Sequence, residues 1–180
     1  MRKLFFAFTM LLLSQISFGQ AVSDNAVIPV SITLNSILRL TVTSGGNIQF
    51  VVNTIDQYTN GIPTGPQYTT TFSVASSRDF NVTMGAEDAT FIGIETGSTA
   101  LALSNLHYTM GGVGAGAIAG LQPLLPLTGP ETIVTTVAGP SATNTYEIQW
   151  ELGTVAPTLL SQSLDADIYV TNVFLNVAPQ

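Results

Sequence analysis

Apolar and polar residues alternate along residues 37–53. Every second position is apolar on either side of a central Gly45-Gly46 pair, at Leu38, Leu40, Val42, Ile48, Phe50 and Val52. This period of two is typical of strands with one buried face. Because glycine readily adopts the positive φ angles of tight turns, the pattern predicts a β-hairpin over residues 37–53.

The same period recurs along most of the chain. It predicts strands at residues 27–34, 68–74, 80–84, 91–94, 99–103, 133–137, 146–152 and 167–177. Residues 110–120 are predicted to form a loop, and no capped amphipathic helix is expected. Nine or ten short strands with turns rich in Gly, Pro, Asn and Ser indicate an all-β fold, namely a single β-sandwich of immunoglobulin-like or pilin-like type. A jelly roll or closed barrel is the alternative.

The N-terminus has the pattern of a cleaved secretory signal peptide over residues 1–19. Arg2 and Lys3 precede an apolar stretch, residues 4–13, that is too short to span a bilayer. Small residues allow cleavage after Gly19 or after Ala21. We therefore expect export to the extracellular space or the cell surface, with the periplasm as the alternative. No later stretch contains 18 apolar residues, so no integral membrane segment is expected in the mature chain.

Removing the signal peptide leaves a predicted N-terminal arm and first strand, residues 20–34, followed by a β-sandwich domain, residues 35–180. The mature chain has two cations, Arg39 and Arg78, against eleven acidic residues, which gives a net charge of −9. Binding to nucleic acid requires the opposite sign of charge and is not expected. The chain has no cysteine, so hydrophobic burial has to stabilise the fold without disulfides.

Candidate catalytic groups are scarce. His107 is the single histidine, and the chain has no GxSxG motif, no cysteine and, after residue 19, no lysine. A Ser-His-Asp triad, a histidine–cysteine zinc site and Schiff-base chemistry are therefore not expected. His107 is interpreted as a surface or packing residue, and the protein is predicted not to be an enzyme, with no catalytic, cofactor-binding or metal-binding residue assigned.

Pairs of carboxylates are the remaining candidates for a catalytic or metal-binding site. Glu147 and Glu151 share a strand face about 13 Å apart, farther than the roughly 5–9.5 Å of glycoside hydrolases. Asp165 and Asp167, about 7 Å apart on a strand, could form a carboxylate pair or supply two calcium ligands. Solvated acids are the simpler interpretation of all four. Trp150 has the same period as its apolar neighbours, which favours a core position over a sugar-stacking surface position.

The backbone itself offers another kind of function. Unprotected sheet edges recruit strands from neighbouring molecules, and fimbrial subunits assemble by inserting a terminal strand into the next subunit. Residues 21–34 have suitable length and alternation for such a strand. Pairing within its own domain is the simpler expectation for this arm, and addition to a neighbour is the alternative.

The export signal, the early LxLxVTSGGNIxF stretch at residues 38–50 and the alternating C-terminal strand together resemble small secreted bacterial surface proteins with immunoglobulin-like or pilin-like sandwiches. Residues 150–152 also form a WxL tripeptide, and the tail at residues 169–179 is partially similar to WxL-type surface domains. The second tripeptide, at residues 174–176, has neither Trp nor Leu. No wall-binding residue is therefore transferred from that family.

These observations predict a non-enzymatic secreted or cell-surface protein with a structural or adhesive role, in its most specific form a fimbria-like subunit assembled by strand addition. The expected partners are copies of itself or other surface subunits, and no cofactor is expected. The alternative is an extracellular carbohydrate- or calcium-binding module that uses Tyr58 or Tyr68 and the acidic loops.

Overall fold

The structure, a computed structural model, describes residues 28–136 and 144–180. The chain divides into two units, Met1–Leu34 and Asn35–Gln180, and each is described by itself. The predicted signal peptide lies outside the described residues and stays a prediction.

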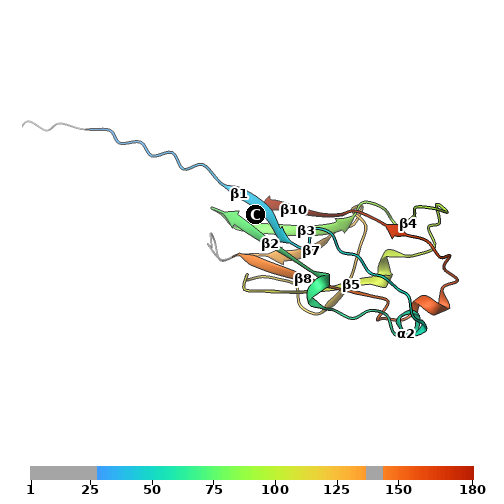
Figure 1. The fold of residues 1–180 in the computed structure, drawn as a ribbon. Coiled ribbons are helices and arrows are strands. Elements are labelled where there is room, and N and C mark those ends of the chain that lie inside the picture. Colours follow the sequence, from blue (N-terminus) through green and yellow to red (C-terminus); the bar gives the residue numbers. More distant parts are fainter. Residues whose placement is uncertain (1–27, 137–143) are drawn as a thin grey trace, which may run out of the picture. The chain divides into compact units, whose positions relative to one another are not determined.

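Within the described residues, ten strands form three sheets (Figure 1). The largest sheet has the order β1 (Leu38–Ser44), β2 (Thr69–Ser76), β8 (Thr145–Leu152), β5 (Leu106–Gly112) and β6 (Leu121–Pro123). The second has the order β10 (Val173–Pro179), β3 (Phe80–Ala86) and β7 (Glu131–Thr135). A short ribbon pairs β4 (Ile92–Gly93) with β9 (Tyr169–Val170). This arrangement confirms the predicted all-β sandwich.

The core lies between the two larger sheets and follows the alternation in the sequence. In β8 every second residue is buried, in the order Tyr146, Ile148, Trp150 and Leu152. The largest sheet also contributes Phe72 and Tyr108, and the opposite sheet contributes Phe80, Val82, Met84, Ile133 and Val134. Because the inner faces are apolar and the outer faces polar, burial of one face fixes the register of each strand.

The predicted hairpin over residues 37–53 is wrong in its pairing. Its first half is β1, but β1 pairs with β2 in antiparallel register, with Leu40 opposite Val74. The second half forms no strand, although Ile48, Phe50 and Val52 pack against the core. An extended segment that lies over a core shows the same alternation as a paired strand, which is why the sequence pattern was misleading here.

Three other predicted elements also differ. Residues 99–103 form no strand, because Ala102 makes only an isolated bridge to Thr90 and Leu103 begins a 3₁₀-helix. The predicted loop at residues 110–120 begins inside β5, whose burial does not alternate. The predicted final strand is divided into β9 and β10 at Thr171 and Asn172.

The described part of the chain contains one α-helix, α2 (Ile55–Asn60), which the sequence analysis did not predict. Thr54 Oγ1 accepts a hydrogen bond from Gln57 N at 3.2 Å, and Gln57 Oε1 accepts one from Thr54 N at 3.1 Å. This capping box stabilises a helix with no buried residue, so no amphipathic pattern marks it. Among residues 28–136 and 144–180, no helix has the length and apolarity to cross a membrane.

Residues 28–34 form no strand in the structure. Val27, the first residue of the strand predicted there, lies outside the described residues. All seven side chains from Ile28 to Leu34 are exposed. The predicted first strand is therefore absent from the described residues 28–34.

Candidate functional site

His107 lies on β5 with only 8% of its surface exposed. Its Nδ1 atom is buried and has no hydrogen-bond partner among the described residues. The residue opposite on β8 is Glu151, whose carboxylate accepts a hydrogen bond from Thr154. In a Ser-His-Asp triad a carboxylate accepts a hydrogen bond from Nδ1 and orients the ring, and no described residue does so for His107. Of the two interpretations offered by the sequence, packing rather than surface exposure applies.

Asp167, one member of the predicted acidic pair, holds a distant loop in place. Its Oδ1 accepts a hydrogen bond from Glu95 N at 3.0 Å, and its Oδ2 accepts from Thr96 N at 3.0 Å and from Thr96 Oγ1 at 2.6 Å. Ile168 N also donates to Oδ1, at 2.6 Å. The side-chain hydrogen bond from Thr96, followed by the backbone bond from Glu95, lowers the pKa of Asp167 to about 2. The backbone carbonyl oxygen of Asp165 accepts a hydrogen bond from Tyr169 Oη.

The lowered pKa of Asp167 predicts a pH-dependent loop. Because the folded-state pKa lies below the usual value of 3.8, the carboxylate stabilises the loop at pH above about 4, and this contribution is lost as the pH falls towards about 2. We expect hydrogen exchange of the Glu95 and Thr96 amides, measured by NMR, to accelerate several-fold over that interval relative to the intrinsic rate. Asp167→Asn should show the faster exchange already at neutral pH. Asp165→Asn is the matched control, and equal acceleration in both variants would contradict the assignment.

Two further acids have a similar structural task that the sequence did not reveal. Glu87 Oε2 accepts a hydrogen bond from Asn172 Nδ2 at 2.6 Å, and Asp88 Oδ2 accepts one from Thr171 Oγ1 at 3.3 Å. Thr171 and Asn172 form the bend between β9 and β10. These two acids therefore hold the connection between β9 and β10, which belong to different sheets. The partners are more than 80 residues apart in the sequence, so the sequence pattern did not indicate this role.

The aromatic candidates for sugar stacking belong to the core. Trp150 is 5% exposed, and its Nε1 donates to Thr70 Oγ1 at 3.0 Å, which confirms the predicted core position. Tyr58 and Tyr68 are partly buried against the core. The ring of Tyr68 stacks on that of Phe50, with centroids 4.3 Å apart. Since a sugar-binding platform needs an exposed aromatic face, the buried Trp150 does not supply one, and Tyr58 and Tyr68 are only partly exposed.

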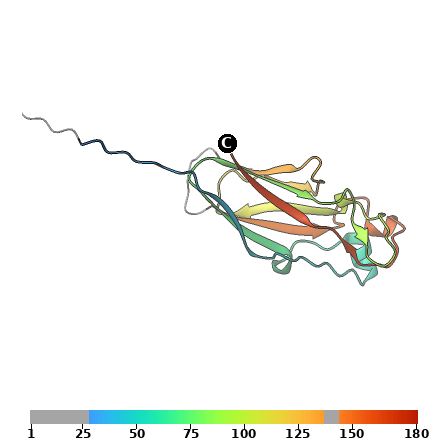
Figure 2. The ribbon, with the colours of Figure 1, turned by 90° about the horizontal axis from the view of Figure 1, so that it is seen from above.

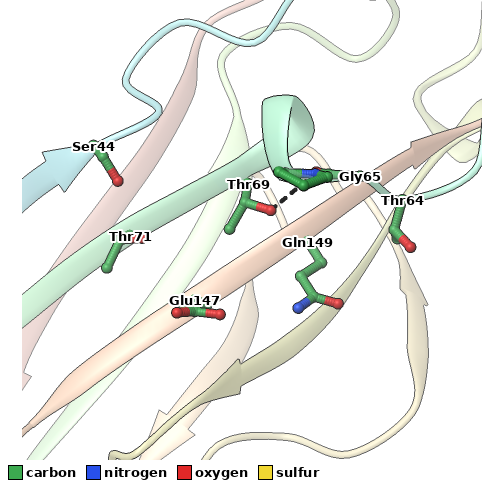
Figure 3. A pocket seen from close by; sticks show the side chains of 8 residues that line it. Ser44, Thr64, Gly65, Thr69, Thr71, Glu147 and Gln149 are labelled. Carbon is green, nitrogen blue, oxygen red and sulfur yellow. Dashed lines mark hydrogen bonds between the residues drawn. The ribbon is translucent and has the colours of Figure 1, made fainter.

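A shallow polar hollow of about 450 Å³ lies on the outer face of the largest sheet (Figure 3). It is lined by Ser44, Thr64, Gly65, Pro66, Thr69, Thr71, Glu147 and Gln149. Thr69 Oγ1 donates to the Gly65 carbonyl oxygen at 3.1 Å, as the dashed line in Figure 3 shows. The remaining hydroxyl, amide and carboxylate groups could hydrogen-bond to a polar ligand, but no aromatic side chain lines the hollow.

The strongest exposed feature is apolar. In residues 28–34 the aliphatic side chains alternate with polar residues and Pro29, and their exposed fractions are 81% for Ile28, 80% for Val30, 79% for Ile32 and 90% for Leu34. Side chains two residues apart lie on the same face of an extended chain, about 6.6–6.8 Å from each other. An exposed apolar row of this kind is a candidate for an interaction surface. We call residues 28–34 the arm.

Comparison with protein-family models and with curated proteins finds no match to this chain.

Proposed function

We propose that this protein is a non-enzymatic structural or adhesive protein, exported and displayed at the cell surface as a fimbria-like subunit that assembles by strand addition. The observation that carries this proposal is the arm, whose four aliphatic side chains are exposed and uncovered. An extended segment with one apolar face has the form of a strand that lacks its sheet. Its backbone groups and its apolar face would both be satisfied at the edge of a neighbouring sandwich.

The rest of the molecule is compatible with this role. Asp167, Glu87 and Asp88 accept hydrogen bonds from other parts of their own domain. The mature charge of −9 disfavours nucleic acid as a partner. The alternative, an extracellular carbohydrate- or calcium-binding module, is less well supported, because the hollow has no stacking surface and Asp167 already accepts four hydrogen bonds.

A pair of substitutions in the arm tests the proposed function. Ile32→Asp places a charge on the apolar face, and we expect it to abolish polymers in electron microscopy and size-exclusion chromatography. Because the Ile32 side chain is 79% exposed, the melting temperature should change little. Thr33→Asp adds the same charge on the opposite face and is the matched control, with polymers retained. Removal of residues 21–34 should likewise abolish assembly without preventing export.

Persistence of polymers in both the Ile32→Asp variant and the arm deletion would show that the arm is not the donor strand. Absence of polymers in the unsubstituted protein under all conditions would contradict the proposed function itself.

A further inference from the structure

The two larger sheets have four edge strands in the described part of the domain, and two of these are poor acceptors of another strand. β6 has three residues and ends at Pro123, which has no backbone N–H. The outer side of β7 is already occupied, because Thr135 N donates to Gly116 O and Ile118 N donates to Ile133 O, both at 2.9 Å. Short length, proline and coverage are the ways in which proteins protect sheet edges.

β1 is longer but is protected in another way. Arg39 lies near its beginning with an exposed side chain. The register with β2 shifts between Val42 and Ser44, which marks an irregularity of the β-bulge type. A charge and a bulge both discourage pairing at an edge.

β10 has none of these protections over most of its length. Its register with β3 is uninterrupted, it contains no charged residue, and its only proline is Pro179 at the end. Glu87 N donates to Asn172 O and Gln180 N donates to Asp79 O. These two bonds show which residues of β10 direct their backbone groups towards β3. Since bonded and non-bonded pairs alternate in an antiparallel ladder, the N–H and C=O groups of Val173, Leu175 and Val177 point to the open side.

The ribbon β4–β9 extends this open edge towards the far end of the domain. Ile94 N donates to Ile168 O at 3.0 Å, so the backbone groups of Tyr169 face away from β4 by the same alternation. Ile92, Ile94, Ile168 and Val170 share one face of the ribbon and are 38%, 62%, 60% and 43% exposed. Exposed aliphatic side chains therefore accompany backbone groups that pair with no other strand among the described residues.

The free part of this edge is its first half. β1 and β10 lie against each other, and both approach the same turn, because Ser77 N donates to Ile37 O while Gln180 N donates to Asp79 O. The start of β1 thus meets the end of β10. The stretch away from that meeting point, residues 169–175, is named here the β9–β10 edge, and its seven residues equal the arm in length.

We propose that the β9–β10 edge accepts the arm of a second copy of this chain. Neither segment contains a charged residue. The aliphatic row of the arm would extend the exposed surface made by Ile168, Val170 and Phe174, of which the last is 43% exposed. This acceptor edge rests on the proposed function, since it presupposes that the arm is a donor strand.

The placement of donor and acceptor predicts a filament rather than a closed dimer. Figures 1 and 2 both show the C-terminus at one end of the domain and β4 at the other. Ile37, which follows the arm, is bonded to Ser77 near the C-terminal end, whereas the β9–β10 edge extends towards β4. Contacts between different surfaces of successive copies do not close on themselves unless a rotation brings the first copy back.

Two edge substitutions of matched exposure test the acceptor. Val42 on β1 is 44% exposed and Phe174 on β10 is 43% exposed. We expect Phe174→Lys to raise the concentration needed for polymerisation by about tenfold or more, because an inserted lysine blocks an edge. Val42→Lys should leave this concentration within about twofold. Melting temperatures of both variants establish that each still folds.

Engineered disulfides identify the contact directly, because the chain contains no cysteine. Variants with Val30→Cys or Ser31→Cys, one on each face of the arm, are mixed with Phe174→Cys or Val42→Cys and oxidised. Phe174 is the sixth of the seven residues of the edge, so Ser31, in the middle of the arm, lies two residues from the position opposite Phe174 whichever direction the arm runs. We expect crosslinked dimers with Phe174→Cys and none with Val42→Cys.

Each other outcome overturns the acceptor edge in a recognisable way. Crosslinking through Val42→Cys, with polymers lost in Val42→Lys, would place the acceptor on β1 and leave the proposed function intact. A crosslink within one chain carrying both cysteines, with no crosslinked dimer, would show that the arm covers its own edge. Absence of crosslinks and of polymers in every variant, the unsubstituted protein included, would remove the proposed function together with the acceptor.

Discussion

Phe72→Ala is expected to lower the free energy of unfolding by about 3–5 kcal/mol. Phe72 has no exposed surface and lies on β2 between β1 and β8. Its ring stacks on that of Tyr146 with centroids 5.2 Å apart. Truncation removes this contact and leaves a cavity between the sheets that neighbouring strands cannot fill without losing their register. Urea unfolding followed by circular dichroism measures the change.

Ser73→Ala is the matched control, since Ser73 is the next residue on β2 and its side chain lies on the outer face. Its effect should be within about 0.5 kcal/mol. Phe72→Leu should have an intermediate effect because less volume is lost. Equal destabilisation by Phe72→Ala and Ser73→Ala would contradict the assignment of the inner and outer faces of β2. The size of the Phe72 effect also matters because the chain has no cysteine to compensate for a weakened core.

Alternation predicted those strands that have one buried and one exposed face. β2 and β8 show this pattern without interruption, and both were predicted. β5 was not predicted as a strand, because Leu106, His107 and Tyr108 are all buried in succession and its last two residues are glycines. The predicted partner of β1 was wrong for the opposite reason: alternation reports burial on one face and does not report which backbone lies alongside.

The candidate site was less accessible to sequence than the fold. The spacing of Asp165 and Asp167 is visible in the sequence. The residues that donate hydrogen bonds to the carboxylate of Asp167, however, are Thr96 and Glu95, which lie 71 and 72 residues earlier in the chain. Similarly, a strand pattern does not say whether the strand will have one neighbour or two. The identity of β10 as an unprotected edge depends on sheet order, which local residues do not encode. Only the apolar alternation of the arm could be read directly.

The turn after β1 gives the second large effect. Gly45 has a φ of +64°, and a Cβ atom there would lie 2.0 Å from the carbonyl oxygen of Thr69. We expect Gly45→Ala to lower the free energy of unfolding by about 2–4 kcal/mol, from strain at positive φ together with displacement of the adjoining β2 backbone. The carbonyl oxygen of Gly45 also accepts a hydrogen bond from Thr70 Oγ1 at 2.7 Å, and Thr70 Oγ1 accepts from Trp150 Nε1. A shift of this turn should therefore change the fluorescence of the single tryptophan.

Gly46→Ala separates steric conflict from a general sensitivity of the turn to substitution. Gly46 has no positive φ, and the nearest atom to its added Cβ is Val42 Cγ1 at 4.0 Å. We expect its stability within about 0.5 kcal/mol of the unsubstituted protein, or slightly higher, because alanine restricts the unfolded chain. Similar losses in both variants would mean that the turn is not held against Thr69 as described. A loss of stability confined to Gly45→Ala, together with altered Trp150 fluorescence, would show that Gly45 connects β1 to the core through Thr70. This role differs from the hairpin turn that the sequence around Gly45 predicted.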